Sequence, residues 1–155
     1  GHLAASSGVL WKLPEVTRAA GIGYGENRPR GVMLIYPVIS AEHHDISFHN
    51  LLCSDEPSQA ELERCSVERH VDGDSSPAFL LHTANDPVVD VKNSLVLAQA
   101  YADAGVPFEM HIYPDGPHGV ALGNRITRCG VEKYENAAIA QWVSHAVTWA
   151  DSLGS

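Results

Sequence analysis

The chain has 155 residues, of which 45% are hydrophobic and 19% charged, so it is long enough to bury the core of one domain. No stretch approaches the roughly 18 uninterrupted apolar residues that a membrane-spanning helix requires, and we predict no such helix. The formal net charge of −9 repels phosphate backbones and anionic lipid surfaces. We therefore expect neither nucleic acid nor a membrane as a partner.

Cysteine usage gives no sign of a zinc knuckle or a disulfide scaffold. The three cysteines, Cys53, Cys65 and Cys129, are odd in number and have no CxxC spacing. Three free thiols are the main interpretation, and a Cys53–Cys65 bridge stays open for a secreted protein. The cellular compartment is left undetermined.

Three apolar segments have the character of strands. Residues 31–37 are continuously apolar, and residues 78–84 are similar. Both are bounded by residues such as Gly, Pro, Asn and Asp, which is typical of strands buried on both faces of a parallel sheet. We expect the first of them to be central in the sheet. Residues 108–113 alternate between apolar and polar side chains, so we expect this strand at an edge, with one face against water or a polar cover.

Apolar residues at helical spacing predict one helix over residues 90–104, another over about 135–153 and a shorter one over 57–65, besides a helix that begins at His2. The predicted apolar stripe of the 90–104 helix is Val91, Leu95, Ala98 and Ala102. That of the last helix is Ile139, Trp142, Val143, Ala146, Ala150 and Leu153, with Trp142 and Trp149 as packing anchors. This order predicts an α/β fold with about three parallel strands and flanking helices.

Two titratable residues follow consecutive predicted strands. Asp86 stands just after residues 78–84, and His118 stands in a loop rich in Pro and Gly after residues 108–113. In parallel α/β sheets, ligands bind outside the carboxyl ends of the strands. At that edge a carboxylate can orient an imidazole, so Asp86 and His118 are a candidate acid–base pair. Taken alone, the pair is equally well read as an ordinary turn aspartate and a surface histidine.

A family resemblance favours the catalytic interpretation. The opening sequence GHLAA resembles the end of a nucleophile elbow of the form GxSxGGHLA, and YPVIS at residues 36–40 resembles the strand that follows it. HTANDPVV at residues 82–89 completes a pattern similar to the acetyl-xylan and feruloyl-esterase-like carboxylesterases of the α/β-hydrolase class. The triad of that class runs Ser, Asp or Glu, then His along the chain. The resemblance implies Asp86 and His118 as catalytic residues, with no metal and no organic cofactor.

The same resemblance places the elbow serine and the oxyanion-hole segment before Gly1. No GxSxG occurs in the 155 residues, and Ser6 and Ser7 would lie about two helical turns from the elbow. We therefore expect residues 1–155 to be the C-terminal part of a single α/β-hydrolase domain that is inactive alone. We also expect the exposed edge of the first strand to pair with the N-terminal half of the same protein or with a second copy.

Other residues receive supporting roles from the resemblance. His2 follows the elbow and is expected to support it. Residues 40–76 form an excursion or lid-like insertion, in which Phe48, Leu51 and Leu52 are candidate pocket residues or, alternatively, satellite core. The excursion also holds four residues of types that bind metals, namely His43, His44, Asp45 and His49. Because adjacent histidines in a loop are usually solvated, we predict no metal site there.

The first functional hypothesis is a serine carboxylesterase acting on small acyl or acetyl esters, with acetylated plant polysaccharide as one candidate substrate. A second hypothesis is a non-catalytic interaction module derived from half of a hydrolase. A third is a peptidase or dienelactone-hydrolase-like enzyme that uses the same Asp86–His118 pair.

Overall fold

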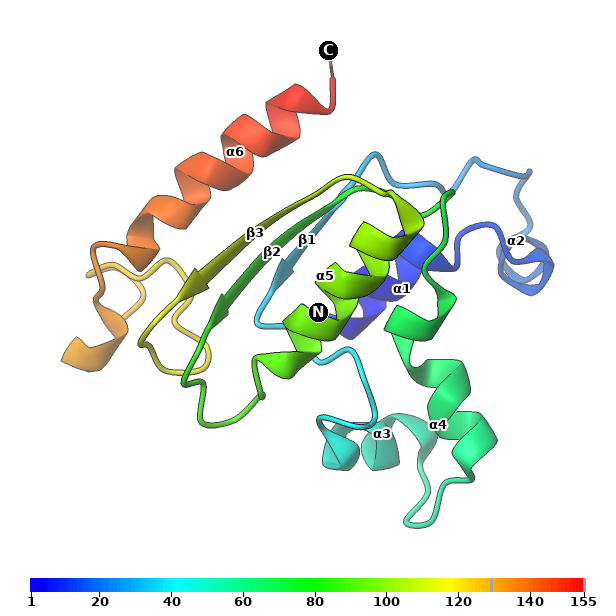
Figure 1. The fold of residues 1–155 in the computed structure, drawn as a ribbon, viewed down its shortest axis with the longest axis horizontal. Coiled ribbons are helices and arrows are strands. Elements are labelled where there is room, and N and C mark those ends of the chain that lie inside the picture. The colour runs from blue at the N-terminus through cyan, green and yellow to red at the C-terminus, as the bar shows by residue number, and fades with distance from the viewer. Residues whose placement is uncertain (129, 155) are drawn as a thin grey trace.

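The computed structural model describes residues 1–128 and 130–154, which form three layers (Figure 1). The middle layer is a parallel sheet in the order β1 (Val32–Ile35), β2 (Ala78–Thr83) and β3 (Phe108–Tyr113). Helices α1 (His2–Val9) and α5 (Lys92–Ala104) pack against one face, and α6 (Trp142–Ser152) packs against the other. The predicted α/β class with parallel strands is confirmed. The shorter elements are α2 (Pro14–Ala20), α3 (Asp45–Leu52), α4 (Gln59–Cys65) and the 3₁₀ helices η1 (Val67–His70), η2 (Glu132–Tyr134) and η3 (Ile139–Gln141).

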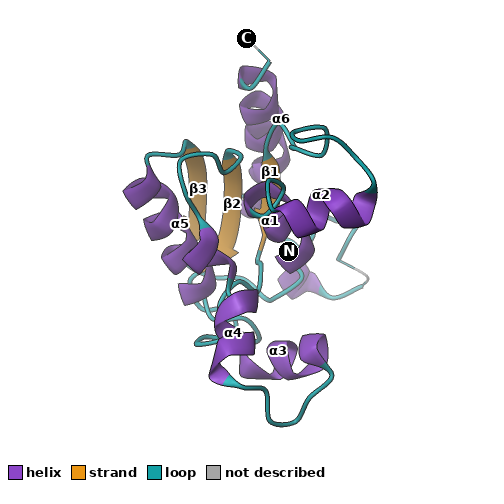
Figure 2. Ribbon diagram, turned by 90° about the vertical axis from the view of Figure 1, so that its right-hand side faces the viewer, coloured by secondary structure: helices purple, strands orange, loops and turns teal. Residues whose placement is uncertain are grey.

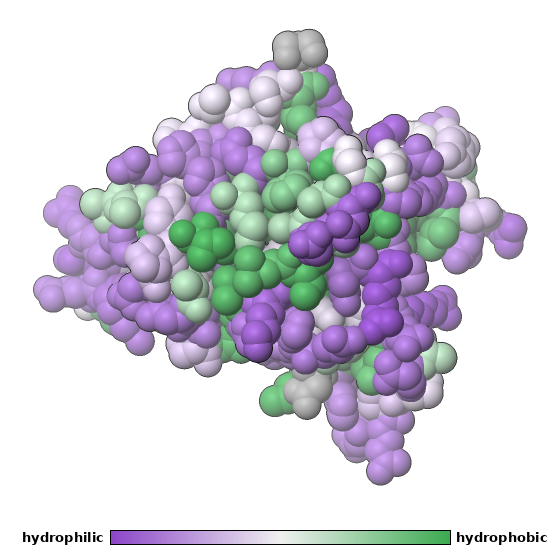
Figure 3. Space-filling model, in the orientation of Figure 1, coloured by the Kyte–Doolittle hydropathy of each residue, from purple (hydrophilic) through white to green (hydrophobic). Residues whose placement is uncertain are grey.

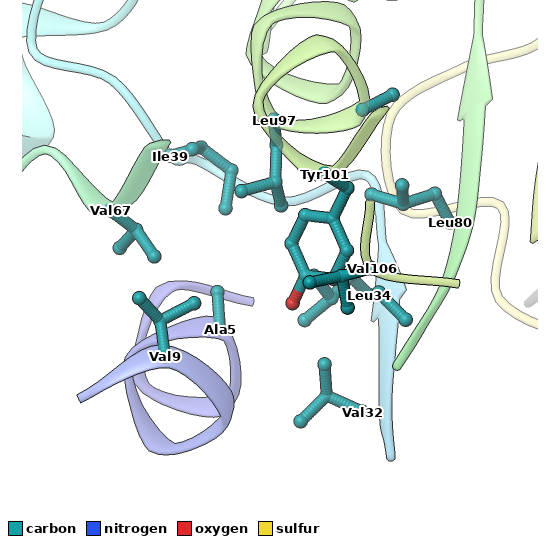
Figure 4. Packing of buried hydrophobic residues seen from close by; sticks show 12 residues of the cluster. Ala5, Val9, Val32, Leu34, Ile39, Val67, Leu80, Leu97, Tyr101 and Val106 are labelled. Carbon is teal, nitrogen blue, oxygen red and sulfur yellow. The ribbon is translucent and has the colours of Figure 1, made fainter. Parts of the chain in front are cut away.

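Strand β2 is the centre of the core, because all six of its residues are buried. Ala78 and Leu80 join the larger cluster with side chains from α1, β1 and α5, shown in close-up in Figure 4. Phe79 and Leu81 face the opposite way and pack against Trp149 and Ala146 of α6. Each large apolar side chain buried in this way stabilises the fold by about 1.5–3 kcal/mol relative to leaving it exposed.

The expectation that the first strand is central and buried on both faces was wrong for the described residues. Strand β1 pairs with β2 on one side only, and Met33 is 43% exposed. The amide of Tyr36, at its end, donates to Leu81 O of β2. No described strand pairs with the opposite edge of β1.

Strand β3 lies at an edge, as expected, but its more exposed side chains are the apolar Phe108 and Ile112. Both faces are partly covered: Met110 packs against the larger core cluster, and on the polar face the His111 ring packs against Phe79 and stacks on His145 of α6. Figure 3 shows apolar surface gathered in the middle of the face on which α5 and β3 lie.

Helix α5 buries a different stripe from the predicted one. Leu95 is 47% exposed and Ala102 is exposed as well, whereas the buried residues are Asn93, Ser94, Leu97, Ala98 and Tyr101. Two polar residues can occupy the buried face because each has hydrogen-bond partners there. The helix ends at Gly105, whose φ of 67° gives the left-handed cap that glycine adopts without a steric penalty.

Helix α6 begins at Trp142, several residues later than predicted. Asn136 Oδ1 accepts hydrogen bonds from the amides of Ala138 and Ile139, which favours a turn over a continuous helix before η3. Trp142 and Trp149 pack as predicted, while Val143 of the predicted stripe is 37% exposed. Helix α2 was not predicted.

The segment between β1 and β2 holds α3, α4 and η1. Figure 2 shows α3 and α4 below the sheet, on the side toward which β2 points. A lid function for residues 40–76 stays a prediction. Cys53 and Cys65 are free thiols, and Cys129 lies outside the described residues. Within the described residues, every helix is too short or too polar to span a lipid bilayer.

Asn93 fastens the start of α5 to the loop after β1. Its Oδ1 accepts from the amides of Ile39 and Ser40 at 2.8 and 3.0 Å, and its Nδ2 donates to Asp90 O at 3.0 Å and His43 O at 3.4 Å. The Asn93 side chain is fully buried. If this side chain is removed, water does not replace its hydrogen bonds.

We predict that Asn93→Ala lowers the free energy of unfolding by about 3 kcal/mol, because it leaves two buried amides without an acceptor. Urea denaturation measures the change. Gln99→Ala, on the exposed face of the same helix, is the matched control and should change stability by less than about 0.5 kcal/mol. Equal effects of the two substitutions would contradict this account of the Asn93 contacts.

Candidate active site

Asp86 and His118 meet at the carboxyl edge of the sheet, where the loops after β2 and β3 lie side by side. Asp86 Oδ2 accepts a hydrogen bond from His118 Nδ1 at 2.8 Å. Asp86 Oδ1 accepts from the amides of Val88 and Val89 at 2.9 and 3.0 Å. The structure therefore brings together the two residues that the sequence identified. Both oxygens of the Asp86 carboxylate accept hydrogen bonds.

The Asp86 carboxylate is almost fully enclosed, with 1% of its side chain exposed. Burial alone would raise its pKa, but the amides of Val89 and Val88 and the imidazole of His118 outweigh this effect. The pKa of Asp86 is consequently lowered, so the carboxylate is ionised at neutral pH. An ionised carboxylate is the form that can hold and orient an imidazole.

The loop that carries His118 is anchored on β2 by polar contacts. Thr83 Oγ1 donates to Gly116 O at 2.9 Å, and the Gly116 amide donates to Asn85 Oδ1 at 3.1 Å. Asn85 Nδ2 also donates to the Asp115 carboxylate. A Cβ at Gly116 would lie 2.8 Å from Thr83 Cγ2, so only glycine allows this close approach. These contacts fix the backbone from which the His118 ring extends.

Tyr36 supports the His118 ring from the end of β1. The two rings are in edge contact, with centroids 4.8 Å apart and planes at 65°. Tyr36 has a φ of 40°, an unusual conformation for a bulky residue that costs on the order of 1–3 kcal/mol. No sequence pattern indicated this conformation, and Tyr36 was missed as a site residue.

A cavity of about 600 Å³ opens beside His118. Because Nδ1 is bonded to Asp86, Nε2 is the His118 nitrogen available to a group bound there. The walls are mostly apolar, and they include one serine, Ser47, among the residues that the structure describes. The remaining side chains that line the cavity are His2, Leu3, Ile35, Tyr36, Val38, Phe48, Leu51 and Val89.

Of the three candidate pocket residues, Phe48 and Leu51 line the cavity beside His118 and Leu52 does not. Phe48 is buried and Leu51 is 52% exposed, and both line the cavity beside His118. Leu52 instead borders a separate groove between α1, α3 and α4. Leu52 is not among the residues that line the cavity beside His118, so its role as a pocket residue stays a prediction.

His2 lies at the cavity wall without contacting the Asp86–His118 pair. Its Nε2 lies 2.7 Å from Cys65 O, its Nδ1 lies 3.5 Å from Ser6 Oγ, and its ring meets Phe48 edge-on. These contacts tie α1 to the segment between β1 and β2.

Over the part of the chain that the structure describes, no group of three or more His, Cys, Asp or Glu side chains is arranged to hold a metal ion.

Comparison with known proteins gives a consistent family assignment. The sequence profile of the prolyl oligopeptidase family matches residues 31–148. An acetyl ester-xyloside bifunctional hydrolase from Caldicellulosiruptor lactoaceticus is 30% identical with a TM-score of 0.79, and the carboxylesterase Cest-2923 from Lactobacillus plantarum is 28% identical with a TM-score of 0.77. The fold of the chain is that of the α/β-hydrolases.

The chain spans about half the length of these structures. Each match covers 99% of the chain, but only 53% of the first structure and 55% of the second. A curated relative, endo-1,4-beta-xylanase B from Butyrivibrio fibrisolvens, is 37% identical over 99 residues, which is 63% of this chain and 15% of that protein.

The lowered pKa of Asp86 predicts how stability depends on pH. The contribution of the ionised Asp86 carboxylate to the free energy of unfolding is fully present above the pKa of an unfolded aspartate, about 3.9. It is lost as the pH falls through the lower pKa of the folded state. We therefore expect the difference in unfolding free energy between wild type and Asp86→Asn to be largest near neutral pH and to shrink in acid. Urea denaturation across this range checks it, with Asp55→Asn, at an exposed position, as control. A difference that does not vary with pH would contradict the predicted ionisation.

Proposed function

This chain belongs to the prolyl oligopeptidase family, and we propose that it supplies the aspartate and histidine of a serine carboxylesterase. The observation that carries the proposal is the 2.8 Å bond from His118 Nδ1 to Asp86, with the apolar cavity beside the same ring. This arrangement is the base and orienting group of a Ser–His–Asp mechanism.

In the proposed reaction, a serine hydroxyl attacks the ester carbonyl while His118 Nε2 removes its proton. His118 then protonates the departing alkoxide as the acyl-enzyme forms. Water next attacks the acyl carbon while His118 removes its proton, and the serine oxygen leaves with that proton, which releases the carboxylic acid. Asp86 keeps the proton of neutral His118 on Nδ1 and stabilises the imidazolium when it forms. The serine belongs to a GxSxG elbow outside these 155 residues, and no step needs a metal ion or an organic cofactor.

We propose small acyl or acetyl esters as substrates, with acetylated plant polysaccharide as one candidate. The apolar walls of the cavity suit a short acyl chain or the alcohol of an ester. The acetyl ester-xyloside hydrolase and the xylanase among the similar proteins support a plant-polysaccharide substrate.

Two alternatives use the same structure differently. A peptidase of this family would use Asp86 and His118 in the same roles, but the two similar solved structures named above favour esters. A non-catalytic interaction module would need neither residue. Reading the coding sequence upstream of Gly1 separates the esterase from the module: an in-frame GxSxG supports the enzyme, and a stop codon or an unrelated domain supports the module.

For the isolated 155-residue chain we predict no hydrolysis of 4-nitrophenyl acetate above that of its His118→Ala variant. Loss of one triad member alone typically costs about 10⁴-fold, and here both the nucleophile and the oxyanion donors are expected elsewhere. Ser6→Ala, Ser7→Ala and Ser47→Ala are the controls. Turnover by the chain that one of these substitutions abolishes would show that the nucleophile lies within it.

We further propose that the open edge of β1 pairs with a strand from the N-terminal half of the same protein or from a second copy. Val32 N donates to Pro77 O and Tyr36 N donates to Leu81 O, so the amides of Met33 and Ile35 point to the opposite edge. An unpaired row of such groups on an apolar strand is a template for a further strand.

From this edge we expect the purified chain to associate in solution. Light scattering at rising concentration should give a mass above 16.7 kDa, because strand pairing satisfies the open edge. Met33→Pro removes an edge amide without breaking a bond to β2 and should return the chain to a monomer. A clean wild-type monomer at high concentration would contradict the proposed pairing.

A further inference from the structure

His82 is a buried histidine that the proposed reaction does not use. It stands in β2 and is fully buried. Both ring nitrogens have partners: Nδ1 lies 2.7 Å from Ser94 Oγ of α5, and Nε2 lies 3.0 Å from Val89 O. Nothing in the sequence pattern of an apolar strand assigned it a function.

These partners determine which nitrogen carries the proton. A carbonyl oxygen only accepts, so Nε2 donates to Val89 O and Nδ1 accepts from the Ser94 hydroxyl. Burial is the largest effect on His82 and lowers its pKa, and the charge of His118 acts in the same direction. The Val89 carbonyl and the carboxylates of Asp86 and Asp90 oppose this without reversing it. His82 is therefore neutral, with its donor fixed at Nε2.

His82 Nε2 shares a neighbour, Val89, with the Asp86 carboxylate and also lies close to it. The Val89 residue that accepts from Nε2 through its carbonyl also donates its amide to Asp86 Oδ1. In addition, Nε2 lies 3.5 Å from Asp86 Oδ2, the oxygen that binds His118. The two histidines therefore lie on either side of one enclosed carboxylate, His118 toward the cavity and His82 toward the core.

We propose that His82 is a positioning residue that fixes the Asp86 carboxylate for His118, through its hydrogen bond to the Val89 carbonyl and through the closeness of its ring to Oδ2. The proposal rests on the proposed function, since it assigns a role in support of that acid–base pair. Asp86 has only 1% of its side chain exposed, so solvent contributes little to holding it. A buried charge with few solvent contacts depends on the protein dipoles around it.

A double-mutant cycle between His82 and Asp86 tests this coupling. His82→Leu fills similar space without a donor, and Asp86→Asn removes the charge. We expect their effects on the unfolding equilibrium constant to be non-additive by about tenfold, as for side chains in one polar network. A histidine that only fills space would give additive effects, and additivity would overturn the proposal.

The matched control pairs Asp86→Asn with His111→Gln. His111 lies on the neighbouring strand β3 and bonds to Glu109, away from Asp86. Its effect should be additive with Asp86→Asn to within about twofold. Coupling as large as that of His82 would show a general response of the core and would overturn the specific role.

Rescue by a conservative variant separates positioning from packing. His82→Gln keeps an amide donor near the place of Nε2, so it should restore much of the coupling to Asp86 and slow exchange of the Val88 and Val89 amide protons. His82→Leu should accelerate that exchange. Equal coupling and exchange in the two variants would contradict the proposal.

If His82→Leu does not fold, Ser94→Ala replaces it in the cycle. This change leaves the imidazole in place and removes only the hydroxyl that fixes its tautomer. We expect it to be coupled to Asp86→Asn, and additivity would again overturn the proposal. None of these measurements uses ester hydrolysis, so their failure leaves the proposed reaction standing. Failure of the esterase assignment would likewise leave the His82–Asp86 coupling measurable.

Discussion

The hydrogen bond between His118 Nδ1 and Asp86 Oδ2 joins two loops that leave the sheet from neighbouring parallel strands. It places an ionised carboxylate almost completely out of water, which costs free energy unless donors replace the lost hydration. Two backbone amides and one imidazole supply those donors. Most other polar contacts at this edge serve to keep these groups in place.

The first turn of α5 shows how the fold meets this requirement. Asn93 and Ser94 are consecutive, polar and fully buried. Asn93 holds the loop after β1 through the amides of Ile39 and Ser40, while Ser94 holds the ring of His82 in β2. The first turn of α5 therefore holds two segments in place: the loop that follows β1, and the part of β2 that carries His82 beside Asp86. Because α5 buries these two polar residues, it does not bury the face that its apolar pattern alone predicts.

The sequence was sufficient for the parts of the fold that depend on local composition. Continuous apolar runs located β1 and β2, and alternation located β3, each to within a few residues of its observed bounds. The rule that sites form at the carboxyl ends of parallel strands brought Asp86 and His118 together as candidates.

Features that depend on distant contacts could not be predicted in this way. The buried face of α5 follows from partners on other elements. The late start of α6 is a local effect of the Asn136 side chain, which apolar spacing alone does not indicate. The positive φ of Tyr36 and the two partners of His82 have no local signature in the sequence. Local patterns therefore located the catalytic candidates but not the residues that support them.

The central claim is that Asp86 fixes the His118 ring so that Nε2 is free for chemistry. The most direct test is the ¹⁵N chemical shift of both ring nitrogens of neutral His118 in the purified chain. We expect a proton on Nδ1 and none on Nε2, with this preference lost in Asp86→Asn. A proton on Nε2 in the wild-type chain would contradict it.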